Sequence, residues 1–268
     1  MKKKFKIGVI GAGFMASSII KGVISSKTAL CGEIIVSDIS EQSLNNVKQF
    51  GVNVTLDSKD VCENSEYVII AVKPQNFSSV ANDIMGCSCN KFISIMAGVK
   101  KSRIKELLGD VKVARCMPNT PCSIGCGAVA IDLTDYLDEY DKTFIKSIFT
   151  TIANVVEIDE ALINAVTGVS GSSPAYFYLF AKSIIDAGVK NGLEYETAKQ
   201  LAVSTMIGAG QMILNNPEKS IEELITAVCS KGGTTIEAVK VYKENDISKI
   251  SEKAVDACVK RAFELENL

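Results

Sequence analysis

The stretch Lys6-Ile-Gly-Val-Ile-Gly-Ala-Gly-Phe-Met-Ala16 decides the fold of this chain. The apolar run from Ile7 to Ile10 predicts a buried strand that leads directly into Gly11-Ala-Gly13-Phe-Met-Ala16, a match to the pattern G-x-G-x-x-G/A. Apolar residues at helical spacing follow between Ile19 and Val23. A strand, a glycine-rich turn and a helix in this order are typical of a dinucleotide-binding α/β domain, because the N-terminus of the helix faces the pyrophosphate.

The small residues of this motif have separate predicted roles. Gly11 permits the tight turn, Gly13 lets the pyrophosphate approach the backbone, and Ala16 keeps the helix close to the sheet. A second apolar strand, residues 33–37, ends at Ser37-Asp38, where a carboxylate can accept hydrogen bonds from the adenine ribose hydroxyls. Motif, strand and acid together predict a dinucleotide site. The alternative is a tight turn in another kind of α/β protein.

Length and charge narrow the class of protein. The chain has 268 residues, enough for one large domain or two modest ones, a net charge of −2 and a pI near 5.5. This balance gives no broad electrostatic surface for nucleic acid or an anionic membrane. The longest uncharged stretch, residues 161–181, is interrupted by polar residues and proline, so we expect no membrane span. Lys2-Lys3-Lys4 is followed by no clear cleavage site, and we expect a cytoplasmic protein.

Cysteine and histidine counts constrain the chemistry. Nine cysteines without a secretory signal predict reduced thiols, and none of their spacings matches a paired C-x₂-C zinc site, so we expect no metal. The chain contains no histidine, which removes the usual general acid or base. Proton transfer then has to come from another side chain, from water or from the substrate.

The two halves of the chain have different patterns. Apolar runs at 67–72, 92–96 and 112–117 predict further parallel strands, and the loops after them, at Lys73-Pro74, Ala97-Gly98 and Pro118-Asn119, lie where ligands bind in doubly wound sheets. From residue 164 only helices are predicted, at about 173–191, 195–215, 220–229, 234–244 and 248–266. We therefore expect a Rossmann-like α/β domain over 1–163 and an all-α domain over 164–268. Residues 201–215 are uncharged, which predicts a helix buried in a dimer.

A second glycine motif, Ser230-Lys-Gly-Gly-Thr-Thr235, precedes the helix predicted over 234–244. The glycines allow close backbone approach, and a hydroxyl residue is expected to cap the first turn. The N–H groups of that turn, with the helix dipole, suit a small anion such as a carboxylate, and the hydroxyls of Ser230 and Thr235 could add contacts. The alternative is a helix cap without a ligand.

The chain closely resembles pyrroline-5-carboxylate reductase, the last enzyme of proline biosynthesis, over essentially its whole length. The order and spacing of six segments carry the resemblance: Gly11-Ala-Gly-Phe-Met15, Ala71-Val-Lys-Pro-Gln75, Ser94-Ile-Met-Ala-Gly98, Arg115-Cys-Met-Pro-Asn-Thr-Pro121, Ala165-Val-Thr-Gly168 with Gly171-Ser-Ser-Pro-Ala-Tyr176, and Ser230-Lys-Gly-Gly-Thr-Thr235. The family joins a dinucleotide domain to a helical dimerisation domain and often forms higher oligomers such as pentamers of dimers.

The resemblance implies an oxidoreductase that transfers a hydride from NADPH or NADH to the C=N carbon of 1-pyrroline-5-carboxylate, giving L-proline. It implies that the substrate carboxylate binds Ser230 and the backbone of Gly232, Gly233 and Thr234. It also implies that the hydroxyl of Thr235, the catalytic residue, forms a hydrogen bond with the ring nitrogen. The cofactor site that it implies consists of Gly11, Gly13, Phe14, Met15, Ser37, Asp38, Ala71, Val72, Lys73, Pro74, Ala97, Gly98 and Asn119.

The sequence departs from the family pattern at three places. Gly171-Ser-Ser-Pro174 replaces the usual Gly-Ser-Gly-Pro, and Ser230-Lys-Gly-Gly233 replaces Ser-Pro-Gly-Gly, which puts a positive charge beside the carboxylate site. After the second strand stands Asp38, where many relatives have hydroxyl or basic residues that accept NADPH. Its carboxylate repels a 2′-phosphate, and no arginine precedes Arg103, so we expect NADH to be used at least as well as NADPH.

Two other functions stay open from the residues alone. A 3-hydroxyacid dehydrogenase shares the two-domain plan, but it needs a lysine one helical turn after a glycine, and no lysine follows Gly171 before Lys182. A paralogue that keeps the fold as a regulatory protein is the other alternative, and only the departures at Ser173 and Lys231 favour it. Tyr176 and Tyr178 stand at helical spacing and are expected to pack rather than to donate protons.

Overall fold

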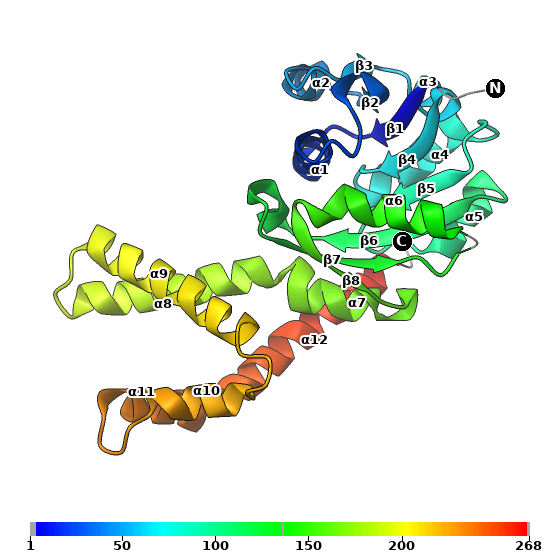
Figure 1. The fold of residues 1–268 in the computed structure, drawn as a ribbon. Coiled ribbons are helices and arrows are strands. Elements are labelled where there is room, and N and C mark those ends of the chain that lie inside the picture. The colour runs from blue at the N-terminus through cyan, green and yellow to red at the C-terminus, as the bar shows by residue number, and fades with distance from the viewer. Residues whose placement is uncertain (1–3, 136, 267–268) are drawn as a thin grey trace. The chain divides into compact units, whose positions relative to one another are not determined.

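The structure, a computed structural model, describes residues 4–135 and 137–266. The chain separates into two compact units. The first contains the residues up to Ser172 together with those from Ala257 onward, and the second contains Ser173–Asp256 (Figure 1). Residues 164–172 and the end of the last helix therefore pack with the sheet. The functional division at residues 163 and 164 stays a prediction.

The first unit is built on a single sheet of eight strands within the described ranges, in the order β3-β2-β1-β4-β5-β6-β7-β8. All neighbours pair in parallel except β6 and β7, which are antiparallel. The strands are β1 (Phe5–Ile10), β2 (Ile34–Ser37), β3 (Asn53–Thr55), β4 (Ser65–Ile70), β5 (Lys91–Ser94), β6 (Lys112–Pro118), β7 (Gly127–Asp132) and β8 (Ala153–Glu157). The chain reverses its direction of winding between β1 and β4, which is the topological switch point of such sheets.

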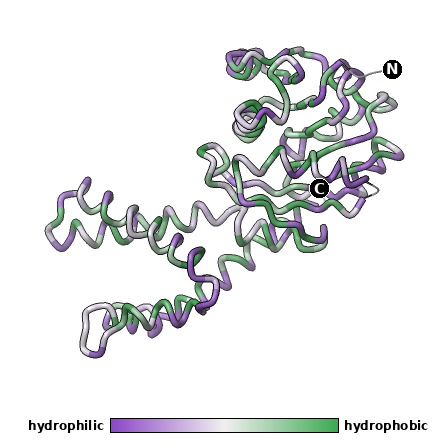
Figure 2. The backbone as a smooth tube through the Cα atoms, in the orientation of Figure 1, coloured by the Kyte–Doolittle hydropathy of each residue, from purple (hydrophilic) through white to green (hydrophobic). Residues whose placement is uncertain are grey.

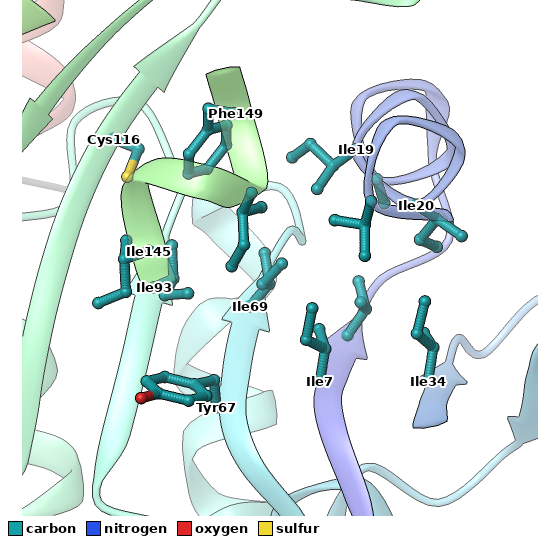
Figure 3. Close-up of a cluster of buried hydrophobic side chains, with 14 of the residues drawn as sticks. Ile7, Ile19, Ile20, Ile34, Tyr67, Ile69, Ile93, Cys116, Ile145 and Phe149 are labelled. Carbon is teal, nitrogen blue, oxygen red and sulfur yellow. The ribbon is translucent and has the colours of Figure 1, made fainter. Parts of the chain in front are cut away.

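Helices cover both faces of this sheet, because alternate residues of each strand point to opposite sides. Ile7, Ile69 and Ile93 face one core together with the helices α1, α2 and α6, and Figure 3 shows these isoleucines beside Ile19, Ile20 and Phe149. The intervening strand residues face a second core under α3, α4 and α5. The bounds are α1 (Phe14–Ser25), α2 (Glu41–Lys48), α3 (Ser58–Asn64), α4 (Phe77–Ile84), α5 (Lys101–Leu108) and α6 (Glu139–Thr150).

Short helical segments complete the first unit, one leading into β2 and the others following β4, β6 and β8. They are 3₁₀ turns at η1 (Cys31–Glu33), η2 (Pro74–Asn76), η3 (Thr120–Ile124) and η4 (Glu160–Leu162), the helix α7 (Ile163–Val166) and the π-helical turn η5 (Thr167–Gly171). Single π-helical turns are rare and frequently stand at functional sites.

The second unit is helical, as predicted, and contains α8 (Ser173–Lys190), α9 (Tyr195–Leu214), α10 (Ile221–Val228) and α11 (Thr234–Glu244). The last helix, α12 (Ile247–Leu265), begins in this unit and ends in the first. Hydrophobic residues alternate with hydrophilic ones along these helices (Figure 2), and many of the hydrophobic side chains are exposed. Among the described residues, no helix combines the length and apolar character that crossing a membrane requires.

Candidate active site

The predicted cofactor residues follow strands whose carboxyl ends are in register. Ile10 of β1 pairs with Ser37 of β2 on one side and with Ile70 of β4 on the other, and Ile70 pairs with Ser94 of β5. The loops at Gly11–Met15, Ser37-Asp38 and Ala71–Pro74 therefore start at one edge of the sheet, around its switch point. Ligands bind at this place in open α/β sheets.

The glycine turn after β1 is fixed by the neighbouring strands. The Gly11 N–H donates to the Ser37 carbonyl over 2.7 Å, and the Ala71 N–H donates to the Ile10 carbonyl over 2.8 Å. Gly11 has a φ of +100°, and a Cβ at this residue would lie 2.7 Å from the Ala71 carbonyl oxygen. Only glycine meets both conditions.

Gly13 marks an open space at the start of α1. Apart from Gly13 and its two chain neighbours, no heavy atom of the described residues lies within 4 Å of the position that a Cβ at Gly13 would occupy. Gly13 is the N-cap of α1, and no side chain accepts a hydrogen bond there, so the first N–H groups of the helix remain available to an anion. Phe14 is 63% exposed beside them. These residues fit the pyrophosphate of a dinucleotide.

Asp38 stabilises the glycine turn through hydrogen bonds. Its Oδ2 accepts the Ala12 N–H over 2.7 Å, and its Oδ1 accepts the Ser40 N–H over 2.8 Å. A carboxylate offers about four lone-pair positions, so two remain for ribose hydroxyls. The Ser37 side chain is fully buried and lies 3.2 Å from the Ser58 hydroxyl, which leaves its backbone as the part that contributes to the turn.

The loops after β4 and β5 carry the other predicted cofactor residues. Ala71 and Val72 are half-buried, Lys73 is exposed at the N-cap of η2, and Pro74 is its first residue. Pro74, Ala97 and Gly98 border a cavity of about 560 Å³ in the first unit. The cavity is also lined by Gln75, Phe77, Ser78, Val99, Lys100, Ser102, Arg103, Glu106, Leu265 and Glu266.

Asn119 uses its side chain to hold the protein together. Its Nδ2 donates to the Ser170 carbonyl of the π-helical turn over 3.1 Å, and its Oδ1 accepts the Ala128 N–H over 2.9 Å. Asn119 is only 8% exposed. It therefore fixes the end of β6 to η5, and any contact with a cofactor would use its backbone or its second amide hydrogen.

The end of α12 packs against the predicted cofactor residue Gly98 in the loop after β5, a contact that the sequence patterns did not indicate. A Cβ at Gly98 would lie 2.8 Å from the Leu265 Cβ, and the φ of Gly98 is +70°. Glu266 forms ion pairs with the buried Arg115 over 3.3 Å and with Lys100 over 3.0 Å. The partners of Arg115 are far apart in the chain, so no local pattern could have revealed them.

The predicted substrate residues form one tight turn in the second unit. The Gly233 N–H donates to the Ser230 carbonyl over 3.0 Å, and Gly232 has a φ of +71°. The expected hydroxyl cap is wrong: Gly233 is the N-cap of α11, and Thr234 and Thr235 are its first helical residues. Glycine takes the cap because a Cβ at Gly233 would meet the Ser230 Oγ at 2.5 Å. Both threonine side chains are exposed.

Two family profiles match the chain, one in each half. Residues 6–98 match the family described as NADP oxidoreductase, coenzyme F420-dependent, and residues 160–265 match the family described as pyrroline-5-carboxylate reductase dimerisation. The first match covers the glycine turn, Asp38 and the loops after β4 and β5. The second covers the Ser230–Thr235 turn.

Comparisons with whole proteins extend the similarity over the full length. The chain is 36% identical to the pyrroline-5-carboxylate reductase of Synechocystis, with 97% of this chain and 98% of the relative covered. It is 33% identical to that of Vibrio alginolyticus, with 98% of each chain covered. The crystal structure of the Plasmodium falciparum enzyme with NADP bound superimposes with a TM-score of 0.89 at 28% identity, over 99% of this chain and 100% of the other. The chain belongs to the pyrroline-5-carboxylate reductase family.

Proposed function

We propose that this chain catalyses the NAD(P)H-dependent reduction of 1-pyrroline-5-carboxylate to L-proline. One observation carries the proposal: pyrroline-5-carboxylate reductases of other organisms match 97–98% of the chain, including both the glycine turn after β1 and the Ser230–Thr235 turn. We also propose a cytoplasmic location and self-association through the helical domain, which the match to the dimerisation family supports.

The residues of the first unit would bind and orient the cofactor. The uncapped N-terminus of α1 would hold the pyrophosphate, and Asp38 would accept hydrogen bonds from the ribose. When bound, the nicotinamide supplies the hydride that goes to the C=N carbon. The loops at Ala71–Pro74 and Ala97-Gly98 would align the ring, and such alignment contributes several kcal/mol to catalysis, about 7 or more in favourable cases.

The residues of the second unit would bind the substrate. The Ser230 hydroxyl and the free N–H groups at the start of α11 would hold the carboxylate, and the Thr235 hydroxyl would form a hydrogen bond with the ring nitrogen. The ring nitrogen needs one proton for each hydride that the carbon of the neutral imine receives, and it can bind that proton before or during hydride transfer. A chain without histidine can manage this, because the imine is basic enough to bring a proton or to take one from solvent.

A direct assay tests the proposal. Purified protein is supplied with 1-pyrroline-5-carboxylate and either NADH or NADPH, the absorbance at 340 nm is followed, and proline is measured. We expect turnover, with proline formed in proportion to the cofactor oxidised. Thr235→Val should lower kcat, whereas Thr226→Val, a change of the same size in α10, should not. Absence of turnover from protein that still binds a cofactor would contradict the proposal.

The cofactor preference is a separate proposal: NADH is used at least as well as NADPH. The charge of Asp38 supports it, because a 2′-phosphate would lie beside this carboxylate. Asp38→Ser should raise the ratio of kcat/KM for NADPH to that for NADH by about tenfold, which corresponds to about 1.4 kcal/mol. An unchanged ratio would show that a residue other than Asp38 discriminates between the 2′-hydroxyl of NADH and the 2′-phosphate of NADPH.

A further inference from the structure

The turn between α10 and α11 carries a lysine that no carboxylate of the described residues neutralises. Lys231 is exposed, and within residues 4–135 and 137–266 it forms no ion pair or hydrogen bond. Two lysines of the same unit are paired, by contrast: Lys243 with Glu222 over 2.9 Å, and Lys182 with Asp186. The charge of Lys231 is therefore available to a ligand.

The geometry of the turn places this charge beside α11. Ser230 and Gly233 are joined by the hydrogen bond that closes a four-residue turn, with Lys231 in its second position and Gly232 in its third. A positive φ in the third position is typical of a type II turn. A side chain at Gly233 would collide with Ser230, so this conformation of the turn requires glycine in its fourth position. Lys231 is held three residues before the first helical residue, Thr234.

The start of α11 is suited to an anion on two further grounds. Within the described ranges no side chain caps the helix, so its first N–H groups are available. The hydroxyls of Ser230, Thr234 and Thr235 have no hydrogen-bond partner within the part of the chain that the structure describes. Glu237 is the acidic residue of the first turn and forms no ion pair with Lys231 there. Hydroxyls, N–H groups and a lysine thus gather around one short turn.

We propose that Lys231 determines specificity for a ring that carries a carboxylate, by attracting that group electrostatically. This role of Lys231 rests on the proposed function, because it concerns how the same site binds the carboxylate of its substrate. The carboxylate is not part of the C=N bond that reacts, so its attraction to Lys231 is equal in the ground state and in the transition state. Such uniform binding changes KM and leaves kcat unchanged.

Two variants of Lys231 and one control test this role. Lys231→Met removes the charge and keeps most of the side chain, and Lys231→Arg restores the charge. Lys219→Met removes the same charge at the other end of α10, which is roughly 12 Å long at 1.5 Å per residue. KM and kcat are measured for 1-pyrroline-5-carboxylate and for 1-pyrroline, which lacks the carboxylate, at low and high salt. If the enzyme does not reduce 1-pyrroline, the affinity for 1-pyrroline is measured instead as its inhibition constant in competition with 1-pyrroline-5-carboxylate.

We expect Lys231→Met to raise KM for the carboxylate substrate by about three- to tenfold at low salt, with kcat within twofold and a smaller effect at high salt. Lys231→Arg and Lys219→Met should keep the KM of the wild type for 1-pyrroline-5-carboxylate. The affinity of Lys231→Met for 1-pyrroline should also equal that of the wild type. An unchanged KM in Lys231→Met, or an equal loss for both rings, would overturn the role of Lys231 while leaving the reductase activity standing. A wild-type protein that does not turn over 1-pyrroline-5-carboxylate would instead overturn the proposed function.

Discussion

Gly11 and Gly13 stand two residues apart, and the structure requires glycine at them for different reasons. Gly11 has a backbone conformation that other residues rarely adopt, and its Cα faces the Ala71 carbonyl. Gly13 has a φ of −72°, which any residue tolerates, and open space beside it. The fold therefore needs the first glycine, whereas the second leaves room for a ligand.

Alanine substitutions should separate these two requirements. Gly11→Ala should lower the free energy of unfolding by at least about 2 kcal/mol, because it combines a strained φ with a backbone collision. Gly13→Ala should change it by less than about 1 kcal/mol but weaken NAD(P)H binding tenfold or more, since the methyl group fills the space of the pyrophosphate. Urea unfolding and fluorescence titration with the cofactor measure the two quantities. Wild-type cofactor affinity in Gly13→Ala would refute this assignment.

Individual elements differ in how far the sequence predicts them. The strands β1, β2, β4, β5 and β6 were predictable because each contains a largely apolar run that leads into a turn of small residues, proline or Asp38. The strands β3, β7 and β8 were not predicted. β7 runs antiparallel to β6, the strand before it in the chain, and this direction is set by strand pairing rather than by the residues of β7 alone.

The candidate site shows the same division. Glycine turns are local, so both were predicted together with the helices that they open. The contact of Leu265 with Gly98 and the hydrogen bond from Asn119 to Ser170 depend on how distant segments pack, and no spacing in the sequence encodes them. The cap of α11 was predicted wrongly because the choice of Gly233 depends on the position of the Ser230 side chain.

A buried ion pair joins α6 to β4 and β5. Asp141 accepts hydrogen bonds from the Tyr67 hydroxyl over 2.5 Å and from the Lys91 ammonium over 2.6 Å. Burial acts to raise the pKa of Asp141, but these two hydrogen bonds outweigh it and hold the pKa below the usual value of 3.8. A lowered pKa stabilises the folded state above pH 3.8, and this contribution is lost as the pH falls through the folded-state value.

The stability difference between the wild type and Asp141→Asn should therefore depend on pH. At pH 7 we expect the variant to be about 2 kcal/mol less stable, because Lys91 loses its charged partner in a largely buried place. Below pH 3.8 the difference should shrink, as Asp141 of the wild type becomes protonated too. Urea unfolding between pH 3 and pH 7 measures this difference. Glu157→Gln, in the exposed pair with Lys146, is the control and should change stability by less than about 0.5 kcal/mol. A difference that does not vary with pH would contradict the ionic account.

At the scale of the whole molecule, the second unit exposes too much apolar surface for a lone chain in water. A groove of about 670 Å³ between α8 and α9 is lined almost entirely by apolar and small residues. Leu201 and Ile207 are 57% and 62% exposed. Exposed apolar patches of this kind mark interfaces between proteins. Residues 160–265 match the dimerisation family of pyrroline-5-carboxylate reductases, so we expect a second copy of the chain to cover this surface.

A charge placed on this surface should separate the copies. In the dimer a carboxylate in place of Leu201 would be buried without a partner, which costs several kcal/mol per copy, about 3 or more. Leu201→Glu should therefore sediment as a monomer at micromolar concentration, and reductase activity should fall if the active site needs both copies. Cofactor binding should persist, because the glycine turn belongs to the other compact unit. Lys199→Glu changes a charged residue of the same helix and should leave the dimer intact. A dimeric Leu201→Glu would place the interface elsewhere, and a fully active monomer would show that one chain is sufficient for catalysis.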